Sequence, residues 1–284
     1  MGGKEKKCIG IIFGGNSNEH HISISSAKTV FKALISKTNI NRFIVKAFYI
    51  NKYGVWFNND LSLEILREKS RNDIPEKCQK VVKREINFLN NIELQSIDIW
   101  FPLLHGLNGE DGAIHGLLKF TQKPLVGSGI LGSALGMDKI LMKKIFSHLT
   151  IPQVNYLAIQ NRDLSNEDIK NNLSEEIIEK LNLPVFVKPA NSGSSLGISK
   201  AKNKSEIIEA LQKAWEIDSR IVIEEGLDVR ELECGIIGNL KLSTSQIGEV
   251  FYSTEWYDYH SKYSMDNKII IPANVDSHIS EQIK

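Results

Sequence analysis

Residues 185–198 read Val-Phe-Val-Lys-Pro-Ala-Asn-Ser-Gly-Ser-Ser-Leu-Gly-Ile, and this stretch decides how the rest of the chain is interpreted. Its apolar residues and Lys188 predict a buried strand that ends at Pro189, because proline has no N–H to donate. Small residues follow at Ser192–Ser195, and Leu196–Ile198 is predicted to resume a strand. The tip of such a hairpin exposes N–H groups and hydroxyls and can fold over a polyphosphate, with the lysine as a point charge beneath it. An ordinary flexible hairpin with a surface lysine is the alternative.

The composition excludes several classes of function. The chain has 284 residues, enough for two or three compact units. Its net charge of +1 argues against nucleic acid or a membrane surface as a partner. No apolar run reaches the roughly 18 residues that span a bilayer, and Cys8–Phe13 is too short for a signal peptide. Three widely spaced cysteines favour a reducing cytoplasm and argue against a disulfide framework or a structural zinc site.

The N-terminal segment predicts a βα unit with a binding edge. Cys8–Phe13 is a continuous apolar run, as expected of a parallel strand that is covered on both faces. A turn with two glycines follows, and a helical pattern begins near residue 20. Ligands of such units bind at the carboxyl edge of the sheet, where Glu19 lies. Its carboxylate is suited to holding an ammonium group, although an acid that favours the helix dipole is the alternative.

A second loop at the same kind of edge is rich in glycine. Ile97–Phe101 predicts another buried strand, and His105–Gly112 follows as His-Gly-Leu-Asn-Gly-Glu-Asp-Gly. Three glycines and two acids suit a loop whose backbone must approach another group closely. We therefore expect His105 to lie in a substrate site rather than in the core.

The segment Gly127–Gly132 fits the pattern G-x-G-x-x-G and could be mistaken for a dinucleotide site. That fingerprint also requires an acid at the end of the next strand. The next predicted strand ends in Gln160 and Asn161, and the strand predicted before the glycines, Lys123–Val126, is very short. We therefore disfavour NAD(P) binding and predict one helix that runs on through Met137-Asp138-Lys139.

The C-terminal half predicts a nucleotide slot and a lid. Arg220–Glu224 is an apolar strand that continues through an acidic link into a second predicted strand at Glu231–Ile237. Backbone groups there could read a base, and carboxylates such as Glu225 could accept bonds from its amino group or from the ribose hydroxyls. The alternative is that Glu224 and Glu225 are simply the exposed end of a strand. Residues 255–264 are aromatic and polar without a core period, which is typical of a lid that excludes water. Lys262 and Tyr263 could point inward from it.

Six motifs, taken together, resemble one known family, the D-alanine–D-alanine ligases of the ATP-grasp superfamily. They are Gly14-Gly15-x-Ser17-x-Glu19, His105-Gly106-x-x-Gly109-Glu110-Asp111-Gly112, Gly127-Ser128-Gly129, Met137-Asp138-Lys139, Val187-Lys188-Pro189 with Gly193-Ser194-Ser195-x-Gly197, and Tyr257-Asp258-Tyr259-x-x-Lys262-Tyr263. The resemblance covers nearly the whole chain. It implies an α/β fold of the ATP-grasp type with an N-terminal Rossmann-like βα domain.

The resemblance also implies roles for single residues on the nucleotide side. Lys139 and Lys188 would neutralise phosphates, while the hairpin with Ser195 would cover the nucleotide. Adenine would be read by Glu224 and the backbone of Leu227, and the ribose by Glu231. We count Glu225 and Lys262 with this nucleotide-binding set.

On the amino-acid side, Glu19 would hold the first ammonium group. Ser194 and Tyr263 would hydrogen-bond into one line with it and close the lid. His105 would lie near the reacting carboxylate. These four residues form the catalytic set that the resemblance implies.

The implied reaction joins two D-alanines, using ATP, through an acyl phosphate, for peptidoglycan precursor synthesis and cell-wall biogenesis in the cytoplasm. The expected partners are D-alanine, ATP and Mg²⁺ (or Mn²⁺), with no nucleic acid and no membrane, and family members are usually homodimers. Tyr263 favours an amine as the second substrate, because relatives that prefer a hydroxy acid often carry Phe there. The alternatives are a D-alanine–D-lactate or D-alanine–D-serine ligase, or a nucleotide-binding remnant without turnover.

The family pattern continues beyond the position of Lys284, and we therefore expect the metal ligands there and none among the present residues. A truncated ligase is the expected explanation, with a shortened protein as the alternative. The predicted division is a substrate-binding domain over 1–126, a central ATP-grasp subdomain over 127–224, and a partial C-terminal subdomain with the lid over 225–284.

Overall fold

The computed structural model describes residues 5–68, 92–160, 166–252, 255–256 and 268–284. The chain divides into two compact units. The first unit contains Met1–Gln153 and Ala190–Gly193, and the second contains Val154–Pro189 and Ser194–Lys284. Tyr257, Lys262, Tyr263 and the rest of the predicted lid after Trp256 lie outside the described residues.

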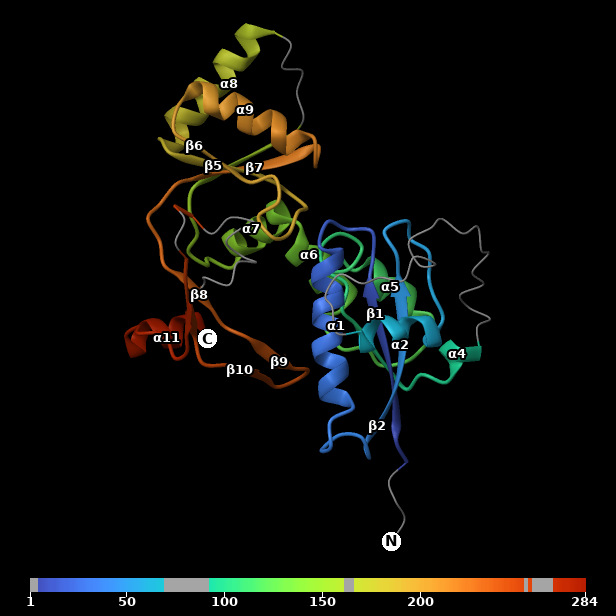
Figure 1. Ribbon diagram of the computed structural model, residues 1–284. Helices are drawn as coiled ribbons and strands as arrows, with labels where there is room; N and C mark the ends of the chain where they lie inside the picture. Colours follow the sequence, from blue (N-terminus) through green and yellow to red (C-terminus); the bar gives the residue numbers. More distant parts are fainter. Residues whose placement is uncertain (1–4, 69–91, 161–165, 253–254, 257–267) are drawn as a thin grey trace. The chain divides into compact units, whose positions relative to one another are not determined.

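The first unit is an α/β structure (Figure 1). Its elements are β1 (Lys7–Gly14), α1 (His20–Leu34), β2 (Phe43–Ile50), α2 (Asn59–Arg67), α4 (Ile92–Gln95), β3 (Ile99–Pro102), α5 (Ala113–Lys119), α6 (Ile130–Met137) and α7 (Lys139–His148). The three strands form a parallel sheet in the order β2-β1-β3. Parallel strands need crossover connections, and α1 provides one of them between β1 and β2.

Alternating side chains of β1 build two cores, one on each face of this sheet. Ile9, Ile11 and Phe13 pack with buried residues of α1 and α2. Cys8 and Ile12 pack on the opposite face with Trp100 and with residues of α5. Because both faces are covered, the strand can be apolar at every position, which is what the continuous run indicated. The prediction of a doubly covered parallel strand is confirmed.

The second unit is built on an antiparallel sheet. Its elements are β4 (Tyr156–Gln160), α8 (Glu167–Leu181), β5 (Val185–Pro189), β6 (Ser199–Ala201), α9 (Lys204–Trp215), β7 (Arg220–Glu225), β8 (Glu231–Glu233), β9 (Ile236–Gly238), β10 (Leu242–Thr244), β11 (Gly248–Phe251), β12 (Lys268–Ile270) and α11 (Ser277–Ile283). The main sheet has the order β4-β7-β5-β6, and a smaller sheet has the order β12-β11-β8. β9 and β10 form a separate hairpin.

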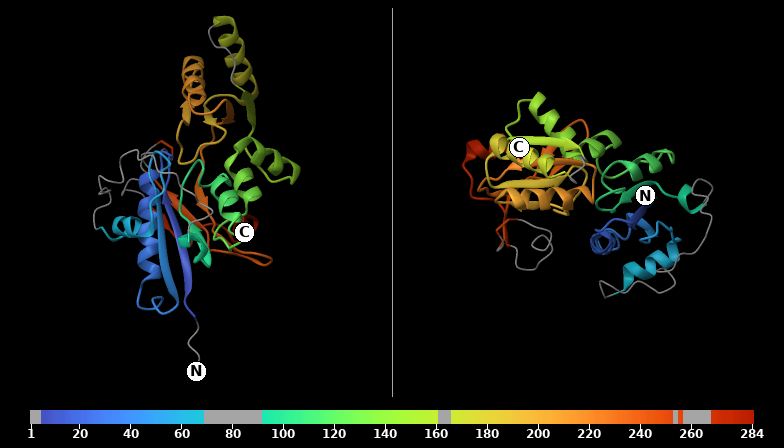
Figure 2. Two further views of the ribbon diagram at one scale, coloured as in Figure 1. Left: turned by 90° about the vertical axis from the view of Figure 1, so that its right-hand side faces the viewer. Right: turned by 90° about the horizontal axis from the view of Figure 1, so that it is seen from above.

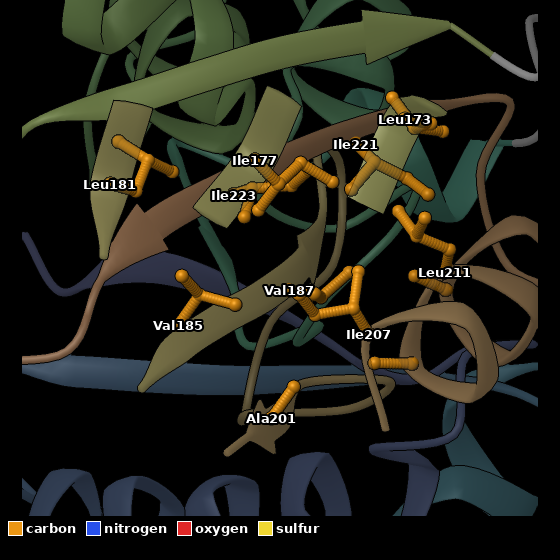
Figure 3. Close-up of a cluster of buried hydrophobic side chains, with 12 residues drawn as sticks. Leu173, Ile177, Leu181, Val185, Val187, Ala201, Ile207, Leu211, Ile221 and Ile223 are labelled. Carbon is orange, nitrogen blue, oxygen red and sulfur yellow. The ribbon is translucent and has the colours of Figure 1, made fainter. Parts of the chain in front are cut away.

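Helices α8 and α9 cover one face of the main sheet (Figures 1 and 2). Figure 3 shows the resulting core, in which Val185 and Val187 of β5 meet Ile221 and Ile223 of β7 beneath the two helices. Leu211 and its neighbours on α9 supply the other side of this core, so the apolar stripe of α9 is structural, as predicted. The opposite face of the sheet is left for other contacts.

Four predicted elements differ in the structure. The hairpin strand resumes at Ser199 rather than at Leu196, and the predicted strand Lys123–Val126 is reduced to one bridge between Trp100 and Leu125. Glu231–Ile237 splits into β8 and β9, which belong to different sheets. The helix predicted to run through residues 137–139 breaks into α6 and α7. The break has a local cause, because Asp138 has an extended ψ of 101° and its side chain accepts hydrogen bonds from the N–H groups of Ile140 and Leu141.

Candidate active site

Two glycines lie directly against the carboxylate of Glu19 in the first unit. Glu19 precedes α1, and only 9% of its surface is exposed. A β-carbon added at Gly106 would lie 2.4 Å from Glu19 Oε2, and one added at Gly193 would lie 3.0 Å from the same atom. Gly106 also has a φ of +70°, a conformation that favours glycine. The glycine after His105 is therefore required to bring backbone against this carboxylate.

Hydrogen bonds join the turn after β1 to the loop after β3. Ser17 Oγ donates to the carbonyl oxygen of His105 at 2.7 Å, and the Glu19 N–H donates to Ser17 Oγ at 3.2 Å. Ser26 Oγ of α1 lies 3.0 Å from His105 Nε2. The structure thus brings Glu19 and His105, which are far apart in sequence, to one edge of the parallel sheet, as the βα pattern predicted.

Glu110 holds His105 from the other side of the imidazole. His105 Nδ1 lies 3.6 Å from Glu110 Oε1, and Glu110 Oε2 accepts a hydrogen bond from the Gly106 N–H at 2.8 Å. The contact with the Glu110 carboxylate raises the pKa of His105, and the charge of Glu19 acts in the same direction. The same contact lowers the pKa of Glu110. This pairing favours a positively charged imidazole beside the Glu19 carboxylate.

Two cavities of the first unit share His105. One of about 520 Å³ is lined by His105, Glu110 and His115 together with Gly127 and Ser128. The glycine-rich segment that resembles a dinucleotide fingerprint thus lines a cavity beside the His105 loop. The other cavity, of about 260 Å³, lies along the turn after β1. Its lining includes Gly14, Gly15, Asn16, Ser17 and His105.

His20 fixes the turn that carries Glu19, a role that the sequence did not indicate. Its Nδ1 contacts the Gly15 carbonyl oxygen and its Nε2 lies 3.0 Å from the Tyr49 hydroxyl. Burial is the main cause that lowers the pKa of His20, which favours the neutral ring. A neutral imidazole has one donor and one acceptor nitrogen, which suits one carbonyl and one hydroxyl partner. His21 touches the His20 ring edge-on from an exposed position.

Lys139 is held by the loop that follows β5. Its backbone N–H donates to the Ala190 carbonyl oxygen at 3.0 Å, and its Nζ donates to the Ser192 carbonyl oxygen at 2.6 Å. The helix break at Asp138 makes this possible, since it starts a new helix with Lys139 at its first position. Lys139 therefore lies beside the small-residue loop, as expected of a residue that acts with it.

A row of side chains crosses the open face of the main sheet in the second unit. Phe186 of β5 pairs with Glu224 of β7 on one side and with Lys200 of β6 on the other. Tyr156 of β4 pairs with Glu224 and extends the row. Paired residues of adjacent strands point to the same face, and Lys188 joins that face because it lies two residues after Phe186. Val185 and Val187 point to the core instead.

A cavity of about 640 Å³ lies over this row, entirely within the second unit. Seven residues of that unit were predicted to bind the nucleotide, and the cleft is lined by the six of them that the structure describes. They are Lys188, Ser195, Glu224, Glu225, Leu227 and Glu231. The seventh, Lys262, lies outside the described residues. Lys188 and Glu224 form an ion pair in its wall, with 22% and 12% of their side chains exposed. The structure thus gathers into one cleft residues that the sequence separates by more than forty positions.

Glu225 lines the cleft and also forms hydrogen bonds within the fold. Its two carboxylate oxygens accept hydrogen bonds from the backbone and side-chain N–H groups of Asn155, at 2.8 and 3.0 Å. The Gly226 N–H then donates to the Pro184 carbonyl oxygen at 2.8 Å. These bonds fix the path of the acidic link as it leaves β7, so that Leu227 stays exposed on the cleft wall.

The small-residue loop carries two serines in an unusual backbone conformation. Ser194 and Ser195 have φ values of +48° and +58°, which few residues other than glycine adopt. Such conformations cost of the order of 1–3 kcal/mol and concentrate at ligand sites. Ser195 lines the cleft of the second unit.

The lining of this cleft also includes residues that were not predicted to bind the nucleotide, and five of them carry aromatic or charged side chains of interest. They are Phe186, Lys200, Tyr252, Glu255 and Trp256. Phe186 and Lys200 could have been found from the alternation along β5 and from the β5–β6 register, had the strand return been placed correctly at Ser199. Glu255 and Trp256 belong to the segment that the sequence assigned to a lid.

Metal ligands are not clustered in the described residues, where no three His, Cys, Asp or Glu side chains gather closely enough to hold an ion. The described residues therefore do not build a magnesium site, and we derive no step from one. No helix in the described part of the chain is long and apolar enough to cross a membrane.

Comparison with known proteins defines the class first. A solved D-Ala:D-Ser ligase, VanG of Enterococcus faecalis, superimposes with a TM-score of 0.73 at 31% identity, over 98% of this chain and 80% of the ligase. The D-alanine–D-alanine ligase of Coxiella burnetii gives a TM-score of 0.76 at 26% identity, over 99% of this chain and 75% of the ligase. The fold is therefore the α/β ATP-grasp fold of these ligases, as predicted.

Sequence comparison then gives the family. Residues 8–128 match the family described as D-ala D-ala ligase N-terminus, and residues 145–284 match the family described as D-ala D-ala ligase C-terminus. The D-alanine–D-alanine ligase of Prochlorococcus marinus subsp. pastoris is 82% identical over 281 residues, which are 99% of this chain and 79% of that protein. This chain belongs to the D-alanine–D-alanine ligase family, so the sequence-based resemblance is confirmed.

Proposed function

We propose that this chain joins two molecules of D-alanine into D-alanyl-D-alanine at the expense of ATP, for peptidoglycan precursor synthesis. One observation carries the proposal more than any other. Six residues that the sequence assigned to nucleotide binding line a single cleft of about 640 Å³. The family match and the 82% identical D-alanine–D-alanine ligase support the choice of substrate.

The cleft of the second unit suits a nucleotide in its chemistry. Lys188 supplies a positive charge on the sheet, and Ser195 adds a hydroxyl and a backbone N–H from the loop. Glu224 and the Leu227 backbone would read the base, and Glu231 would accept from the ribose. Glu225 and Lys262 complete the proposed set, and Lys139 would join it from the first unit. ATP supplies the phosphoryl group that activates the first carboxylate as an acyl phosphate.

The first unit would hold the amino acid. Glu19 would accept hydrogen bonds from the ammonium group of the first D-alanine, beside the backbone of Gly106. A charged His105, favoured by Glu110, would lie near the reacting carboxylate and stabilise its negative charge. Ser194 and Tyr263 would complete the hydrogen-bonded line that excludes water from the acyl phosphate. The chemistry on the protein side is thus positioning and charge stabilisation.

We further propose that the protein acts as a cytoplasmic homodimer, uses Mg²⁺ or Mn²⁺, and has the three-part division 1–126, 127–224 and 225–284. The family match over residues 8–128 supports a boundary near residue 127. Analytical ultracentrifugation tests the dimer, with a sedimentation coefficient of a single chain as the contradicting result.

A second candidate is a ligase that joins D-alanine to D-serine or D-lactate. The observation in its favour is the TM-score of 0.73 with the VanG D-Ala:D-Ser ligase. The 82% identical relative favours D-alanine as the second substrate instead.

One assay separates these candidates. The protein, expressed from its complete reading frame, is assayed for ADP release with D-alanine alone, and with D-alanine plus D-serine or D-lactate. The proposal predicts full ADP release with D-alanine alone and D-alanyl-D-alanine as the product by mass spectrometry. Release that requires D-serine or D-lactate would favour the second candidate. Binding of ATP without release in any mixture would show a remnant and contradict both.

A further inference from the structure

A single carboxylate, that of Glu255, bridges two lysines at the edge of the nucleotide cleft. Its Oε1 lies 2.9 Å from Lys200 Nζ and 2.9 Å from Lys202 Nζ, and its Oε2 lies 3.1 Å from Lys202 Nζ. Lys200 belongs to β6, and Lys202 follows that strand. Glu255 is thus held at the edge strand of the main sheet, although it lies fifty-three residues from the nearer lysine in the sequence.

The next residue makes an aromatic contact inside the cleft. The Trp256 ring packs against Phe186 of β5 with centroids 5.7 Å apart and planes at 73°. This edge-to-face arrangement is one of the two that aromatic pairs favour. Phe186, Trp256, Lys200 and Glu255 all line the cavity of about 640 Å³.

Lys200 connects the two contacts. Its Nζ lies 5.7 Å from the centroid of the Phe186 ring, within reach of a cation–π interaction, while it also holds Glu255. Phe186 and Lys200 are paired in the β5–β6 register, so the backbone fixes their spacing. The paired strands β5 and β6 therefore carry the contacts of both Glu255 and Trp256.

We propose that Glu255 is a positioning residue for nucleotide binding, which acts by holding Trp256 against Phe186 as one wall of the cleft. This rests on the proposed function of the cleft. The two lysines would then serve as its anchor rather than as phosphate ligands. Removing the carboxylate would loosen the wall without removing a group that touches the phosphates.

A double-mutant cycle tests this coupling. We expect W256A to raise the KM for ATP by about tenfold, which corresponds to the upper range of an aromatic pair. E255A should raise it by about fivefold, as expected for two partly exposed ion pairs. Because Glu255 acts through Trp256, the E255A/W256A protein should show about the same tenfold increase as W256A alone.

The other readouts separate positioning from general damage. The KM for D-alanine and kcat should stay within about twofold in all three variants, since the wall belongs to the nucleotide cleft. E255Q should fall between E255A and the parent protein, because an amide keeps the shape but loses the charge. The matched control is E175A, which removes an exposed ion pair with Lys204 at 2.8 Å outside the cleft and should leave every constant unchanged.

Three results would overturn the inference. If the KM for ATP of the double variant rose by about fiftyfold, the product of the two single effects, Glu255 would act independently of Trp256. A lowered KM for ATP in E255A would show that Lys200 is a phosphate ligand held back by the carboxylate. An unchanged KM for ATP in E255A would show that the anchor is incidental. Failure of the proposed function is distinct, because the parent protein itself would then release no ADP with D-alanine.

Discussion

The candidate residues of the two units are positioned by different means. In the first unit, Glu19 is surrounded by the backbone of Gly106 and Gly193, and His105 is fixed by hydrogen bonds from the turn and from α1. In the second unit, Phe186, Glu224 and Lys200 form a row of side chains across the open face of an antiparallel sheet. The first site depends on small residues in special conformations, and the second depends on register.

This difference determines how each site can be damaged. A site formed by close backbone approach is blocked by one methyl group, because the backbone cannot move aside without distorting the loop. A site formed by side chains on a regular sheet loses one interaction at a time when single residues are changed. Glycine substitutions in the first site and side-chain substitutions in the second should therefore differ in how much activity they remove and in whether the amino acid or ATP is affected.

The largest effect is expected for G106A. The added methyl would lie 2.4 Å from Glu19 Oε2, at a φ of +70° that alanine rarely adopts. We expect kcat/KM to fall by at least about a hundredfold, since misplacement of a positioned group by about 1 Å has effects of that size. Steady-state kinetics with D-alanine as the varied substrate measure it.

The control for that change is G116A in α5. An alanine there meets nothing within 4 Å and improves helix propensity. It should leave activity unchanged and stabilise the protein by about 0.5–1 kcal/mol. Equal loss of activity in both variants would contradict the role given to Gly106.

A smaller effect, on ATP, is expected for K188M. The change removes the cation of the cleft and leaves Glu224, whose side chain is 12% exposed, without the charge it now pairs with. We expect the KM for ATP to rise by about ten- to a hundredfold, as for other electrostatic contacts to phosphoryl groups. K180M breaks an exposed ion pair with Glu176 on α8 and is the control. A K188M protein with an unaltered KM for ATP would show that the cleft does not hold the nucleotide.

A modest effect on stability is expected for N203A. The Asn203 side chain accepts a hydrogen bond from the Glu206 N–H and caps α9, which covers the main sheet. Loss of this cap should lower the free energy of unfolding by about 1 kcal/mol. Chemical denaturation measures it, and kcat should be unchanged because the helix lies on the face away from the cleft row. A tenfold fall in kcat would contradict the separation of the two faces.

The smallest effect is the pH dependence of the His105–Glu110 pair. The pKa of His105 is raised from 6.5 in the folded protein. The stabilisation that this shift contributes is therefore fully present below pH 6.5 and is lost as pH rises through the pKa of the folded state. The pKa of Glu110 is lowered from 4.5 in the folded protein. The stabilisation that this shift contributes is therefore fully present above pH 4.5 and is lost as pH falls through the pKa of the folded state. The pair therefore contributes most between about pH 4.5 and 6.5.

The E110Q variant measures this contribution. The difference in unfolding free energy between the parent and E110Q should be below about 1 kcal/mol, since the pair is partly exposed. The difference should be largest between pH 4.5 and 6.5 and should shrink at higher pH. A difference that grows steadily above pH 7 would contradict the assignment of a charged His105.

Sequence patterns predicted the first unit well because its features are local. The apolar run Cys8–Phe13 indicated a strand covered on both faces, and the structure places its alternate residues in two cores. The glycine-rich loop after β3 indicated close backbone approach, and Gly106 lies against Glu19. The role of His20 was missed because its partners, Gly15 and Tyr49, are joined only by folding.

The second unit was predicted less completely because its site depends on register. The strand return at Ser199 was placed at Leu196, since apolar Leu196 and Ile198 suggest a strand while the turn geometry at Ser194 and Ser195 delays it. That error hid the pairing of Phe186 with Lys200. The predicted strand Glu231–Ile237 failed for a similar reason, because its two halves pair with different partners.

The most direct test of the account is ATP binding measured by calorimetry on the parent protein, E19Q and K188M. We assign Glu19 to binding of the amino acid and Lys188 to binding of the nucleotide. E19Q should therefore bind ATP with the parent dissociation constant, within about twofold, while K188M should bind it about tenfold or more weakly. Equal weakening of ATP binding in both variants, or in neither, would contradict the assignment.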